Sequence, residues 1–220
     1  MIEYSIKRSR RKTLSAYVLS DGSVEVRSPM GVSLRTIDAF VRQNEDKLKK
    51  FMDAQIERAD KKRGFKIEIG SRVMLLGEEF TVRDGGGNIE IKDGCFYVQS
   101  FNAKAQVTAL YKAYARRFFT ERVEKYSRIM GLYPNTVKIN SAKTRWGSCS
   151  AKGAVNLSWR LVMASAGAVD YVVIHELAHL KHMNHSAEFW RLVEKYEPNY
   201  REYKVELKAL AERLRGEDWD

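Results

Sequence analysis

The stretch HELAHLKHMNH, residues 175–185, contains all four histidines of the chain. Within it, His175, Glu176 and His179 form an HExxH motif. Side chains at positions i and i+4 lie one above the other on a helix, so two imidazoles can reach one metal ion at about 2.0–2.1 Å. Glu176 then lies one step round the helix, where its carboxylate can hold a water molecule without ligating the metal. The spacing predicts a metal site, and the alternative is a surface helix with incidental histidines.

A catalytic zinc ion usually has three protein ligands and one open position. His182 follows His175 by seven residues, about 10 Å along a continuous helix, and its side chain would have to lean against the preferred direction. His185 can provide the third ligand if the helix ends near His182 and the chain turns back at Met183-Asn184. A ligand on the next helix would be one of the glutamates Glu188, Glu194 and Glu197. The sequence favours His185.

The elements that must position these residues follow Pro134. Val137 and Ile139 alternate in one expected strand, and Val155, Leu157 and Trp159 alternate in the next, with Asn156 on its other face. We expect this second strand, AVNLSW, to offer the edge that pairs with an extended substrate. Helices follow, and the one that carries HExxH has a buried apolar stem and Ser165 as a candidate N-cap.

The preceding part of the chain alternates between strand and helix patterns. Residues 2–28 and 65–100 predict short strands, and residues 33–60 predict one helix. Residues 103–130 predict a long helix with a basic outer face, which ends at Gly131. We therefore expect an N-terminal strand-rich module with one helix over residues 1–101 and a catalytic domain over residues 102–220.

Composition and charge limit the class of protein. The chain has 220 residues, of which 44% are hydrophobic and 30% charged, which excludes a disordered chain and a membrane-spanning one. Its net charge of +11 is uneven, because residues 1–63 carry +6, residues 103–150 carry +8 and residues 151–220 carry −1. The two basic segments are candidate nucleic-acid surfaces. Two cysteines without a CxxC pair, and no apolar segment after the basic N-terminus, predict a cytoplasmic location.

Several motifs together resemble those of a known family. Residues 144–150, TRWGSCS, residues 155–161, VNLSWRL, the run HELAHL and residues 184–190, NHSAEFW, closely resemble the YgjP-like zinc metallopeptidases, which are often grouped with the SprT-like and WLM zincins. The resemblance implies an α+β, minimal zincin-like fold in which a small mixed sheet packs on the HExxH helix. It also implies His175, His179 and His185 as ligands of one Zn²⁺ ion, and Glu176 as the catalytic base.

The expected activity is hydrolysis of peptide bonds by a zinc-activated water, with peptides or proteins as substrates. Arg145, Asn156 and Tyr200 are candidate substrate-binding residues, and Trp146 is expected to pack under the zinc helix. Three alternatives remain at this point: a nucleic-acid-associated protease of the SprT-like kind, a non-catalytic module stabilised by a zinc ion with four protein ligands, and a hydrolase of a non-peptide bond.

Overall fold

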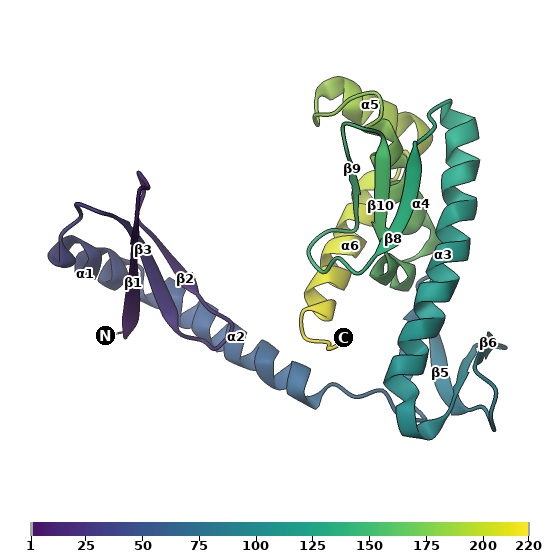
Figure 1. The fold of residues 1–220 in the computed structure, drawn as a ribbon, viewed down its shortest axis with the longest axis horizontal. Coiled ribbons are helices and arrows are strands. Elements are labelled where there is room, and N and C mark those ends of the chain that lie inside the picture. The colour runs from purple at the N-terminus through teal and green to yellow at the C-terminus, as the bar shows by residue number, and fades with distance from the viewer. Residues whose placement is uncertain (1, 220) are drawn as a thin grey trace. The chain divides into compact units, whose positions relative to one another are not determined.

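The structure is a computed structural model that describes residues 2–219 (Figure 1). Its internal contacts divide the chain into two compact units, which are described separately below. The first unit extends to Phe65 and includes Arg215–Asp218, and the second contains Lys66–Leu214 and Trp219. The boundary expected near residue 101 lies inside the second unit, so the assignment of residues 102–220 as a separate catalytic domain stays a prediction.

The first unit packs a three-stranded sheet against two helices. Its elements are β1 (Tyr4–Ser9), β2 (Ser15–Val18), β3 (Val24–Pro29), α1 (Leu34–Gln43) and α2 (Glu45–Gly64). β3 lies between β1, which is parallel to it, and β2, which is antiparallel. Alternate residues Val24 and Val26 are buried with Ile37 and Val41 of α1. This alternation, with the antiparallel pairing of β2 and β3, confirms the short strands expected within residues 2–28.

The single helix expected over residues 33–60 is wrong, because the structure has two helices that meet at Asn44. The Asn44 side chain donates a hydrogen bond to the Phe40 carbonyl at 2.8 Å, and its backbone leaves the helical region at φ −107° and ψ 11°. Asn favours such local bonds to the backbone over the helical ladder. The apolar spacing runs through this position, so it gave no sign of the break.

The second unit begins with a four-stranded sheet and the long helix α3. The strands are β4 (Arg72–Leu75), β5 (Glu78–Asp84), β6 (Glu90–Lys92) and β7 (Cys95–Val98), in the order β4-β5-β7-β6. A short 3₁₀ helix, η1 (Ser100–Asn102), leads into α3 (Ala103–Met130). Gly131 ends α3 at φ 67°, a left-handed conformation that glycine adopts without cost.

A second small sheet and three helices complete this unit. The sheet contains β8 (Thr136–Asn140), β9 (Gly147–Cys149) and β10 (Ala154–Ser158). The 3₁₀ helix η2 (Trp159–Met163) connects it to α4 (Ala166–Ala178), α5 (Ala187–Tyr196) and α6 (Tyr200–Leu214). This mixture of helices and small mixed sheets confirms the α+β class. No helix among residues 2–219 is long and apolar enough to span a membrane.

The strand AVNLSW does not offer the free edge that we expected. β10 lies in the middle of its sheet, parallel to β8 on one side and antiparallel to β9 on the other (Figure 1). Both of its edges are therefore occupied by neighbouring strands. The alternation of apolar residues identified the buried face of β10 but could not identify its neighbours. The two edge strands of this sheet are β8 and β9, and β9 is only three residues long.

Helix α4 is the central element of this part of the unit. Its side chains Val169, Val173, Ile174 and Leu177 are completely buried. Ser165 caps its N-terminus by accepting a hydrogen bond from the Ala168 N–H, as the sequence predicted. Six of its last seven residues, Val172–Ala178, are buried, although this stretch contains the polar His175 and the charged Glu176 of the HExxH motif.

Candidate active site

Three histidines converge at the C-terminal end of α4. His175 lies in its last turn, and His179 is its C-cap. The chain then turns, with the Lys181 and His182 N–H groups both bonded to the Ala178 carbonyl, and returns His185 to the same place just before α5. One side-chain ligand atom from each of His175, His179 and His185 lies within 4.8 Å of the other two.

The geometry of these imidazoles suits one metal ion. Nε2 of His175 and Nε2 of His185 are 3.1 Å apart. Tetrahedral nitrogen ligands at about 2.0–2.1 Å from a zinc ion lie roughly 3.3 Å from one another. Burial and the neighbouring His179 and His185 lower the pKa of His175 to about 3, so its ring is neutral at pH 7, as a metal ligand must be.

The backbone near His182 orients one of these rings. The His182 carbonyl oxygen is 3.0 Å from Nδ1 of His179, which donates to it in the matching tautomer and leaves Nε2 for a metal. Among the residues that the structure describes, the group of candidate ligands contains neither the His182 side chain nor Glu188, Glu194 or Glu197. Of the candidate third ligands in the described part of the chain, the turn at the helix end thus brings His185 to His175 and His179.

Aromatic side chains restrict the three imidazoles. Phe189 is completely buried, and its ring centroid lies 4.9 Å from that of His175, 4.5 Å from that of His179 and 4.8 Å from that of His185. Trp190 stacks on His185 at 5.5 Å. The first turn of α5 holds both rings in place, because Ser186 caps it by accepting from the Phe189 N–H.

Glu176 lies on the same helix, with its carboxylate against β9. The side chain is 5% exposed, and burial raises its pKa to about 7 while the charge of Arg145 opposes this shift. Within residues 2–219 no protein group donates a hydrogen bond to this carboxylate. The carboxyl group can therefore hold or release a proton near neutral pH.

Gly147 of β9 gives this carboxylate its space. A Cβ atom at position 147 would lie 2.5 Å from Oε1 of Glu176, closer than side-chain atoms approach in proteins. The position therefore needs glycine for a close approach rather than for its backbone angles, because its φ is not positive.

The outer edge of β9 faces away from β10, and its outward backbone groups have no backbone hydrogen-bond partner within residues 2–219. The Ser158 N–H donates to the Trp146 carbonyl at 2.8 Å, and the Ser150 N–H donates to the Ala154 carbonyl at 2.9 Å. In an antiparallel pair the residues between such bonds point their N–H and C=O groups outward. Gly147 and Cys149 thus present hydrogen-bonding groups on the edge that lies next to Glu176.

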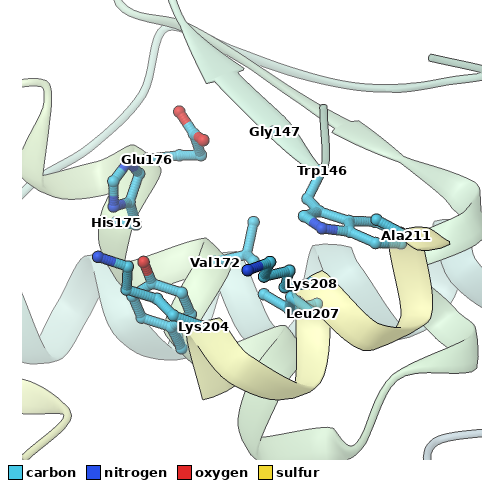
Figure 2. A pocket seen from close by; sticks show the side chains of 10 residues that line it. Trp146, Gly147, Val172, His175, Glu176, Lys204, Leu207, Lys208 and Ala211 are labelled. Carbon is cyan, nitrogen blue, oxygen red and sulfur yellow. The ribbon is translucent and has the colours of Figure 1, made fainter. Parts of the chain in front are cut away.

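A pocket of about 340 Å³ opens beside His175 and Glu176 (Figure 2). Residues from β9, the segment before it, α4 and α6 line it: Trp146, Gly147, Tyr171, Val172, His175, Glu176, Lys204, Leu207, Lys208 and Ala211. The polar side chains of this lining that the sequence analysis missed are those of Tyr171, Lys204 and Lys208. Tyr171 is four residues before His175 on the same helix face, which was an available signal. Burial and the charge of Glu176 raise the pKa of Tyr171 to about 12.

The three candidate substrate-binding residues lie in different surroundings. Arg145 is exposed and close enough to Glu176 to lower its pKa. Asn156 pairs in register with Ser148 of β9 in the middle of the sheet. Tyr200 is buried and stacks on Trp190 at 5.2 Å. None of the three lines the pocket, and their substrate-binding roles stay predictions.

Comparisons with known proteins agree with the family resemblance of the sequence. A family model described as YgjP-like, metallopeptidase domain, matches residues 12–210. The solved structure of the metallopeptidase zymogen of Pyrococcus abyssi abylysin is 30% identical, with a TM-score of 0.39, and the match covers 41% of this chain and 92% of that one. For the zymogen of Methanocaldococcus jannaschii jannalysin the identity is 22%, the TM-score 0.36 and the coverage 41% and 96%. No curated protein matches significantly.

Proposed function

Because the chain belongs to the YgjP-like metallopeptidase family, we propose that it hydrolyses peptide bonds with a zinc ion held by His175, His179 and His185 and with Glu176 as general base. The observation that carries this proposal is the convergence of three imidazoles on one point, beside a buried carboxylate of the same helix. Three nitrogen ligands and one remaining position are typical of catalytic zinc sites.

The chain's own residues account for the other parts of the reaction. A zinc ion at the three histidines would polarise the scissile carbonyl and the attacking water. The carboxylate of Glu176 accepts the proton of that water and delivers it to the leaving amine, and a pKa of about 7 suits both transfers. The outward N–H and C=O groups of Gly147 and Cys149 hold an extended peptide as an added strand beside this carboxylate.

The three alternatives are less well supported. A zinc-stabilised module without activity needs four protein ligands, whereas the group of candidate ligands within residues 2–219 has three members. For nucleic-acid binding, the basic face of α3 is partly neutralised along the helix itself, since Arg117 and Arg128 lie 4.0 and 3.9 Å from Glu121 and Glu124. The exposed strand edge and the family favour a peptide over a non-peptide substrate.

The direct test replaces the proposed base. Glu176→Gln, loaded with one equivalent of Zn²⁺ and incubated with a casein digest, should lose roughly 10²–10⁴-fold in cleavage rate, measured by mass spectrometry of the products. Its zinc content should equal that of the unmodified protein, because Gln leaves the histidines in place. Glu202→Gln, an exposed position on α6, is the matched control. A fully active Glu176→Gln protein would refute the mechanism.

A further inference from the structure

Two lysines of α6 line the pocket beside the catalytic carboxylate. Lys204 and Lys208 are four residues apart, so they project from one face of the helix. Figure 2 shows Lys204 below His175, with Lys208 further along the helix and Trp146 on the side of the pocket opposite His175. We propose that this pocket binds a carboxylate group of the substrate, carried by an acidic side chain next to the cleaved bond or by the C-terminus of the peptide. This inference rests on the proposed peptidase function and names its substrate class.

The walls of the pocket suit a short aliphatic chain that ends in a charge. Trp146, Val172, Leu207 and Ala211 supply an apolar surface. The methylene groups of aspartate or glutamate can pack on it while the carboxylate reaches the ammonium groups. The volume of about 340 Å³ lies near the lower end of the range of small-ligand sites, enough for one side chain rather than for a second folded element.

The two ammonium groups have no carboxylate partner in the described part of the chain. No aspartate or glutamate oxygen of residues 2–219 lies within 4.0 Å of Nζ of Lys204 or Lys208. The nearby acid of α6, Glu206, is occupied, because both the N–H and the hydroxyl of Ser165 donate to it at 2.6 and 2.7 Å. Glu176 is the one acidic residue that lines the pocket. A substrate carboxylate therefore meets two ammonium groups that make no ion pair with residues 2–219.

The position of Lys204 is partly fixed. Its Nζ lies 4.7 Å from the centroid of the Trp190 ring, a cation–π contact with the side chain that also stacks on His185. This contact places the ammonium of the exposed Lys204 beside a ring that packs on the histidine group. A basic substrate residue would be repelled there, and a neutral polar one would gain no charge interaction. The pocket thus selects by charge as well as by shape.

The test measures binding, so that it does not depend on turnover. The probes are fluorescein-labelled, alanine-rich octapeptides with capped ends that carry one glutamate at each position in turn. The same peptides with glutamine provide the neutral comparison, and a glutamine peptide with a free C-terminus tests the terminal carboxylate. Fluorescence anisotropy with the zinc-loaded Glu176→Gln protein gives each Kd without cleavage.

We expect the peptide with glutamate at one position, or the peptide with a free C-terminus, to bind roughly five- to tenfold more tightly than the matching neutral peptide. Two partly exposed charge pairs can supply an effect of this size. Lys204→Met/Lys208→Met should abolish this difference, and Lys204→Glu/Lys208→Glu should reverse it in favour of lysine-containing peptides. Lys125→Glu/Lys195→Glu changes the net charge by the same amount as the Glu double variant, but at exposed positions outside the pocket. It should leave the preference for glutamate unchanged.

Each outcome decides the proposal. Equal binding of glutamate and glutamine peptides at every position, with no gain from a free C-terminus, would overturn it, and so would a preference that survives the Met double variant. Cleavage of a casein digest by the unmodified protein is measured in parallel. If cleavage fails while the carboxylate preference is found, then the proposed function is wrong and the carboxylate site stands. If cleavage succeeds and no carboxylate preference is found, then the proposed function stands and the carboxylate site is wrong.

Discussion

Gly147→Ala should separate the catalytic carboxylate from the rest of the site. The added methyl group would lie 2.5 Å from Oε1, 2.7 Å from Cγ and 2.8 Å from Cδ of Glu176. An ordinary contact begins at 3.4 Å, so the carboxylate must retreat by about 0.9 Å. A displacement of about 1 Å in a catalytic group can cost 10²-fold in rate, or roughly 2.7 kcal/mol of transition-state stabilisation.

The same substitution should affect stability much less than rate. The backbone at position 147 has no positive φ, so alanine adds no strain there. Moving the Glu176 side chain off its preferred rotamer should lower the free energy of unfolding by roughly 0.5–1.5 kcal/mol. Replacing glycine should raise it by about 0.4–1 kcal/mol, because alanine has fewer conformations in the unfolded chain.

The assay compares kcat on a fluorogenic peptide found by digest mapping, the zinc content and the thermal midpoint. Gly64→Ala, where a Cβ would meet nothing within 4 Å, is the control. Gly147→Ala with unchanged kcat would refute the proposed position of the base. Loss of zinc would show instead that the strand positions the histidines.

Two further predictions concern the metal ligands and the support of α4. His185→Ala should lower the zinc affinity at least tenfold, measured by competition with a chromogenic chelator. His182→Ala should leave this affinity unchanged, because His182 contacts His179 through its backbone carbonyl and is not among the candidate ligands. Equal losses of affinity in both variants would contradict the ligand assignment. Asp170→Asn should lower the free energy of unfolding by roughly 3 kcal/mol in urea titrations, since it removes the partner of the partly buried Arg122; a loss below about 0.5 kcal/mol would show that the pair is solvated.

The sequence predicted those features that depend on local geometry. The spacing of His175 and His179 reports the helix turn directly, and Ser165 marks the start of that helix. The third histidine was predicted from how helices end, and the structure shows the chain turning back after Ala178. In each case the interacting residues are near in sequence.

The features that the sequence did not predict depend on contacts between distant segments. A five-residue strand shows which of its faces is buried, but the neighbours of β10 come from residues 136–140 and 147–149. Three-residue β9 carries no periodicity at all. Lys204 and Lys208 join the site only because α6 lies against α4, and a lysine pair on an amphipathic helix is otherwise typical of a solvated face.

A crystal structure of the zinc-loaded protein, with anomalous diffraction measured at the zinc absorption edge, would locate the metal ion directly. We predict one zinc ion at about 2.0–2.1 Å from a ring nitrogen of each of His175, His179 and His185, with Glu176 outside the ligand set. A fourth protein ligand on that ion would rule out a catalytic zinc site, and zinc bound elsewhere with the three histidines metal-free would rule out this ligand set.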